Sequence, residues 1–137
     1  MRLWHKDLIP VLPKNQLIGQ WRELCLIAKN INEKGTPNHL LVNKIMNYPL
    51  SHLWKYGFLV MCEMDNRHYK CDFRKFEKYF DKPYALATPS YEELFHNWHN
   101  NIYYIQCFFN LQEKHDCGGI SDEDWIKIIN KYLVSFH

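Results

Sequence analysis

Apolar residues recur at helical spacing along most of the chain, and proline or glycine separates the periodic segments. The clearest stripe consists of Leu17, Trp21, Leu24, Ala28 and Ile31. It predicts a helix over residues 14–32 that ends at Gly35. Alternation of apolar and polar residues is short-lived, so the pattern does not favour strands. We therefore predict an all-α fold, with about four to six helices in a single compact domain over residues 1–137.

The middle of the chain carries further helical signals. Thr36-Pro37 is typical of a helix N-terminus and predicts a short helix that continues to Met46. Further predicted segments are a helix over residues 50–66, a short helical turn over 73–80 and a loop over 81–89.

The last third of the chain is expected to form two helices. Ser90 and Glu93 have the spacing of a capping box, which predicts a long helix that ends at Gly118-Gly119. Its expected buried stripe is Leu94, Trp98, Ile102, Ile105 and Phe109. Ser121 is the expected cap of a final helix. The apolar stripe of that helix is Trp125, Ile128, Ile129 and Leu133.

Composition fits a globular domain with an unevenly distributed charge. The chain has 137 residues, of which 47% are hydrophobic and 16% aromatic, enough for a sizeable core. Residues 1–55 carry eight basic and three acidic side chains, a net charge of +5, whereas the remainder carries nine and twelve, a net charge of −3. A polyanion would be attracted to the first part of the chain. An ordinary solvated surface is the other interpretation.

The sequence favours an intracellular, cytoplasmic protein without a membrane segment. No stretch approaches the roughly 20 uninterrupted apolar residues that span a bilayer, and the first residues lack the apolar run of a signal peptide. The five cysteines are odd in number and show no CxxC spacing, so we expect free thiols in a reducing compartment.

One carboxylate stands out in the first predicted helix. Glu23 points away from the buried stripe, and its neighbours on that side, Gly19, Leu26 and Ile27, are not the charged residues of a solvated face. The apolar N-terminal segment Met1–Trp4 is a candidate to cover this side, and Gly19 leaves room for a backbone or a ligand to approach. An α-amino group has a reference pKa of about 7.7–8.0, and an amine beside a carboxylate can form a Schiff base. A surface glutamate beside a loose N-terminus is the alternative.

A family resemblance is carried by the same residues. The chain opens with Met1-Arg2-Leu3-Trp4, continues with Gly19-Gln20 and Arg22-Glu23, and later contains Asn38-His39-Leu40-Leu41. Over about residues 1–80 it resembles the pyrimidine-dimer DNA glycosylase family of the phage endonuclease V type, in particular its largely uncharacterised bacterial and phage branch. A fainter match surrounds His99 and residues 110–114.

The resemblance implies an endonuclease V-like helical domain that acts as a DNA glycosylase and abasic-site lyase. Its substrate would be a damaged or modified base in double-stranded DNA, and the target nucleotide would leave the base stack. The α-amine of Met1 would form a Schiff base with the sugar, with Glu23 as the catalytic carboxylate. The predicted DNA-binding residues are Arg2, Trp4, His5, Gly19, Gln20 and Arg22. No cofactor and no metal are expected, and the protein is expected to be a monomer.

The chain also departs from the family pattern. Because Arg2 is too large for the usual removal of the initiator methionine, we expect Met1 itself to supply the amine. Leu26 stands near a position where the phage enzyme has arginine, and the last helix begins with acidic residues. The pyrimidine dimer is therefore not assumed as the substrate.

Other functions stay open at this stage. The same scaffold could be a DNA-binding protein without turnover, or a helical module that binds another protein. His96 and His99, one helical turn apart, could share a metal with Cys107 or His115, although the spacing matches no known zinc motif.

Overall fold

The structure is a computed structural model that describes residues 1–136, and this part of the chain contains helices and turns but no strand. The α-helices are α1 (Lys14–Lys34), α2 (Leu50–Asn66), α3 (Arg74–Glu77), α4 (Asn101–Asp116) and α5 (Asp122–Phe136). Shorter 3-10 helices are η1 (Lys6–Val11), η2 (Asn43–Asn47) and η3 (Tyr84–Leu86). The all-α prediction is confirmed.

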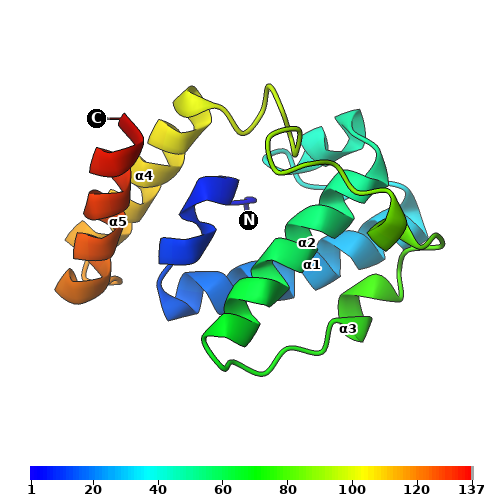
Figure 1. Cartoon of the computed structure of the whole chain (residues 1–137), viewed down its shortest axis with the longest axis horizontal. Coiled ribbons are helices and arrows are strands. Elements are labelled where there is room, and N and C mark those ends of the chain that lie inside the picture. Colours follow the sequence, from blue (N-terminus) through cyan, green and yellow to red (C-terminus); the bar gives the residue numbers. More distant parts are fainter. Residues whose placement is uncertain (137) are drawn as a thin grey trace.

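The N-terminal segment lies in the middle of the fold. Helices α1 and α2 pack together, α4 and α5 form a second pair, and η1 lies between the two pairs (Figure 1). Leu8, Ile9 and Leu12 are buried there, together with Leu3. The N-terminal segment is therefore part of the core.

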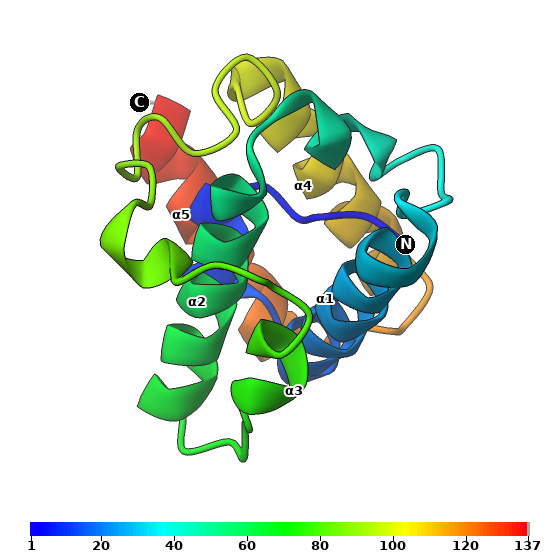
Figure 2. The ribbon, with the colours of Figure 1, turned by 90° about the vertical axis from the view of Figure 1, so that its right-hand side faces the viewer.

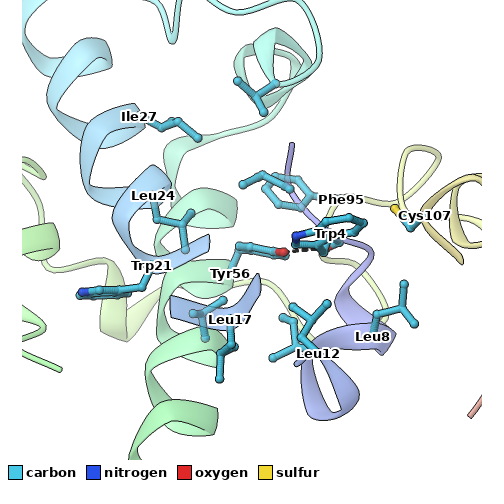
Figure 3. Close-up of a cluster of buried hydrophobic side chains, with 14 of the residues drawn as sticks. Trp4, Leu8, Leu12, Leu17, Trp21, Leu24, Ile27, Tyr56, Phe95 and Cys107 are labelled. Atoms are coloured by element: carbon cyan, nitrogen blue, oxygen red, sulfur yellow. Dashed lines mark hydrogen bonds between the residues drawn. The ribbon is translucent and has the colours of Figure 1, made fainter. Parts of the chain in front are cut away.

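The first predicted helix forms largely as expected. Leu17 and Leu24 point into the core (Figure 3), whereas the ring of Trp21 lies on the other side of α1 and stacks on Phe73. Gly35 ends α1 in the left-handed conformation, with φ 75°, and donates its N–H to the Ile31 carbonyl. Ile27 departs from the prediction, because its side chain is completely buried rather than on the outer face with Glu23.

Helix α2 has the predicted bounds and provides the other half of this core. It begins after Pro49 and buries Tyr56 against the N-terminal segment (Figure 3). Gly57 is needed where α2 meets α3, since a Cβ atom at this position would lie 2.4 Å from the ring of Phe76.

The predicted helix over residues 36–46 is wrong in its first part. Thr36 accepts the N–H of Asn38 through its hydroxyl, and Asn38 adopts a left-handed conformation with φ 57°. These features form a turn instead of a helix start. Only η2, at the end of this segment, is helical.

The long helix predicted from Ser90 to Gly118-Gly119 is wrong in its first part, although it ends where expected. Ser90 and Glu93 form the expected capping hydrogen bond, but Phe95 and Asn97 have φ values of 51° and 69°, which end any helix. Helix α4 begins only after Asn100, whose side chain accepts the N–H of Tyr103.

The break shifts the buried face of α4. The residues that α4 buries are Tyr104, Cys107 and Leu111, whereas Ile102 and Phe109 of the predicted stripe are exposed. The final helix begins as predicted, with Ser121 accepting the N–H of Asp124, but Leu133 is exposed. All five cysteines are free thiols, as expected.

Candidate active site

The extended start of the chain is held against α1 by one buried glutamine. Gln20, which is 1% exposed, accepts the backbone N–H of Trp4 at 2.8 Å and donates its amide N–H to the carbonyl of Arg2 at 2.9 Å. The Tyr56 hydroxyl donates to the Trp4 carbonyl at 2.6 Å (Figure 3). These bonds satisfy buried backbone groups on both sides of Leu3.

Helix α4 holds the same segment from the opposite direction. The hydroxyl of Tyr103 donates to the carbonyl of Leu3 at 2.6 Å, and Leu3 itself is completely buried. Burial raises the pKa of both Tyr103 and Tyr56, so each hydroxyl keeps the proton that it donates. Three helices, α1, α2 and α4, therefore hold the backbone of residues 2–4.

A second set of contacts fixes the chain just after this segment. His5 stacks on His99, with ring centroids 5.1 Å apart, and its Nδ1 accepts the N–H of Asp7. The Nδ1 of His99 accepts the backbone N–H of Lys6. Burial lowers the pKa of His5 and holds that of His99 well below its ordinary value, which keeps both rings neutral acceptors. The Lys6 ammonium donates to the carbonyls of Tyr91 and Leu94.

A pocket of about 260 Å³ opens at the first residue. Its lining residues come from four parts of the sequence and are Met1, Arg2, Trp4, Glu23, Leu41, Asn110 and Lys114. The structure thus brings Met1 and Glu23 to one pocket, and the N-terminal segment lies against the Glu23 side of α1. The Gln20 amide lies 3.5 Å from the Glu23 carboxylate and helps to orient it.

This pocket is lined both by the residue that carries the α-amine, Met1, and by the Glu23 carboxylate. Within residues 1–136, no ion pair joins the Met1 amine to Glu23. Arg2 and Lys114 add positive charge, and the Arg2 guanidinium lies 5.4 Å from the centre of the Trp4 ring. An anionic group beside the pocket would meet two cations, and an electrophilic carbon within it would meet an amine.

Three pocket residues were absent from the predicted site, namely Leu41, Asn110 and Lys114. Asn110 and Lys114 lie one turn apart on α4, so both face the pocket. The fainter match over residues 110–114 was the only sequence signal for them. Without the fold, nothing indicated that this part of α4 lies beside the N-terminus.

Arg22 lies outside the pocket and faces a basic surface instead. It is exposed, and it lines two adjoining hollows of about 470 and 440 Å³. The basic side chains of these hollows, which we call the basic groove, are Lys14, Arg22, Lys29, Lys70, Lys75 and Lys78. Neither hollow has an acidic lining residue, and Trp21 lies between them. Lys70, Lys75 and Lys78 lie beyond residue 55, in the part of the chain that has a net negative charge. The charge distribution along the sequence therefore did not predict the groove.

The other predicted DNA contacts are placed differently. His5 and Gln20 are buried and hold the N-terminal segment, so their direct contact with DNA stays a prediction. Trp4 is mostly buried but lines the pocket. Gly19 is partly exposed, and a Cβ atom there would meet nothing within 4 Å, so no part of the described chain approaches it closely.

The metal alternative finds no support in the geometry. Residues 1–136 contain no group of three or more histidine, cysteine, aspartate or glutamate side chains arranged to hold a metal ion. His99 lies in the buried histidine pair, while His115 bonds to Asp122 at 2.8 Å. Within the same range, none of the helices is both long enough and apolar enough to cross a bilayer.

Comparison with known proteins assigns the class. A family model described as pyrimidine dimer DNA glycosylase matches residues 1–77, which includes the N-terminal segment, Glu23 and most of the basic groove. No curated protein and no solved structure matches the chain. The match places the chain among the DNA glycosylases. Because it covers more than half of the sequence, the chain belongs to the pyrimidine dimer DNA glycosylase family.

Proposed function

We propose that this protein is a DNA glycosylase and abasic-site lyase that acts through the α-amine of Met1, with Glu23 as its catalytic carboxylate. The observation that carries the proposal is the pocket that these two residues share. Its substrate is a damaged or modified base in double-stranded DNA. The target nucleotide leaves the stack so that its sugar enters the pocket.

The reaction needs no further co-reactant besides water. The neutral amine of Met1 attacks C1′, and the base leaves with the electron pair of the glycosidic bond and takes up a proton. Opening of the sugar then gives an imine between the Met1 nitrogen and C1′, while Glu23 moves the amine proton to the ring oxygen. Loss of a proton from C2′ expels the 3′ phosphate, and hydrolysis of the imine restores the amine.

The electrostatics of the pocket support this sequence of steps. A carboxylate near C1′ stabilises the positive charge that develops as the base departs. Arg2 and Lys114 lie at the same pocket and suit the flanking phosphates. Arg22 and its neighbours in the basic groove suit the backbone further along the duplex.

A DNA-binding protein without turnover would need the basic groove but not the pocket. That alternative gives no reason for three helices to hold residues 2–4 at a pocket that Met1 and Glu23 share. The two functions are separated by strand cleavage at a single lesion.

The test measures cleavage of duplexes that carry either an abasic site or one damaged base. Wild type should cleave the abasic duplex, and Glu23→Gln should lose at least about a hundredfold in rate, as expected when a catalytic acid or base is removed. Glu33→Gln is the matched control, because Glu33 is exposed near the end of the same helix. If wild type binds the duplex without cutting it, the non-catalytic alternative holds.

A further inference from the structure

Two adjacent leucines protrude from the connection between α1 and α2. Leu40 is 90% exposed and Leu41 is 52% exposed. Scattered exposed leucines are ordinary, but Leu40 contributes almost nothing to the core and Leu41 only about half of its surface. Their exposure therefore calls for a reason outside the core.

The turn that carries them is rigid. Val42 is completely buried beneath it. The His39 carbonyl accepts the N–H groups of Val42 and Asn43 at 3.1 and 2.9 Å, and the Asn43 side chain accepts the N–H of His39 at 3.1 Å. Both leucines are thus presented from an anchored backbone.

The turn stands at the rim of the pocket. Leu41 is one of the pocket's lining residues, with Met1 and Glu23. Figure 2 shows the connection between α1 and α2 beside the N-terminus. From residue 34 to residue 62 the chain has three lysines and no acidic residue, so nothing in this stretch repels phosphates.

We propose that Leu40 and Leu41 form an apolar wedge that enters the base stack of the duplex and holds the target nucleotide out of it. The inference rests on the proposed function, because the pocket can receive a sugar only from a nucleotide that has left the stack. Leucine is among the residues that proteins insert between base steps, where the apolar side chain replaces lost stacking. An apolar pair at the rim of the pocket is placed for this role.

The experiment compares wild type with Leu40→Ala/Leu41→Ala. Leu86→Ala is the matched control, because Leu86 is 89% exposed in η3 and does not line the pocket. The duplex carries a tetrahydrofuran abasic analogue next to 2-aminopurine, whose fluorescence rises when it unstacks. Wild type and the control should raise the fluorescence, and the double variant should lose most of the rise.

A second readout separates the wedge from the chemistry. Borohydride trapping on abasic DNA should fall roughly tenfold for the double variant on a duplex and stay unchanged on a single strand, where no stack has to open. Failure of wild type to trap on both the duplex and the single strand would contradict the proposed function, while the fluorescence would still test the wedge. Equal fluorescence from wild type and double variant would overturn the wedge. A double variant that differs from wild type only in its self-association would also overturn the wedge, because the turn would then be a contact between protein molecules.

Discussion

Gln20 bonds to the backbone N–H of Trp4 at 2.8 Å and so connects the middle of α1 to the start of the chain. The same side chain donates to the Arg2 carbonyl, and it lies one helical turn before Glu23. One buried amide thereby holds the residues that follow the proposed nucleophile and helps to orient the proposed carboxylate. This link makes Gln20 the first residue to test outside the chemistry itself.

Replacement of Gln20 by leucine should affect both stability and trapping. The Trp4 N–H and the Arg2 carbonyl would lose their partner, and leaving buried polar groups unpaired costs about 1–3 kcal/mol each. We expect a lower free energy of unfolding in urea and a weaker imine adduct. Gln106→Leu, on an exposed part of α4, should change neither quantity. A Gln20→Leu variant that is less stable but traps as well as wild type would contradict our account. It would show that the Gln20 hydrogen bonds stabilise the fold without affecting the reaction of the Met1 amine.

The buried histidines predict a loss of stability in mild acid. His5, His52 and His99 each accept a backbone N–H at Nδ1, which requires an unprotonated ring nitrogen. Burial lowers the pKa of all three, although Asp7 acts in the opposite direction on His5. The unfolded chain therefore binds protons that the folded chain excludes.

Stability should be fully present above the unfolded histidine pKa and should decline as the pH falls below about 6.5. The slope is at most about 1.4 kcal/mol per pH unit for each histidine that gains a proton on unfolding. Urea unfolding at several values between pH 7.5 and pH 5 measures it. A free energy of unfolding that stays constant over this range would contradict the neutral state of the cluster.

Charge removal in the basic groove should change the salt dependence of DNA binding. Arg22→Ala and Lys75→Ala each remove a cation that we place against the phosphate backbone. Each should reduce the slope of log K against log salt by about 0.9 if the residue neutralises one phosphate. Lys127→Ala removes a similar charge from α5, outside the groove, and should leave the slope unchanged. If all three variants keep the wild-type slope, the DNA does not lie along the basic groove.

Two glycines should respond in opposite ways to alanine. Gly57→Ala should destabilise the fold by about 1–3 kcal/mol, because the new Cβ atom would overlap the Phe76 ring. Gly19→Ala should stabilise it by about 0.5–1 kcal/mol, since this helical position is open. Thermal unfolding checks both signs. Weaker DNA binding by the stabilised Gly19→Ala variant would support a contact at Gly19, whereas unchanged binding would remove Gly19 from the predicted interface.

The sequence predicted what periodicity and local signals encode. The bounds of α2 and the end of α1 at Gly35 follow from apolar spacing and from the residues that break helices. It failed at Ser90, where the capping signal was present but Phe95 and Asn97 adopt left-handed conformations that depend on contacts elsewhere in the fold. Tertiary packing overrides local preference at such positions.

The site was predictable only in part for the same reason. Glu23 could be singled out on α1, and the opening residues could be matched to a family. The packing of distant segments decides the rest. It brings Lys114 to the pocket, buries His5, and places Lys75 and Arg22 along the same hollow. No periodicity within one element contains that information.

The measurement that tests the central claim most directly is borohydride trapping on a duplex with one abasic site, followed by mass spectrometry of the adduct. The pocket holds two amines, those of Met1 and Lys114, so the position of the adduct decides between them. We predict an adduct on the α-amine of Met1 that survives Lys114→Arg and is lost when the N-terminus is blocked. An adduct on Lys114, or the absence of any adduct from a protein that binds the duplex, would contradict the account.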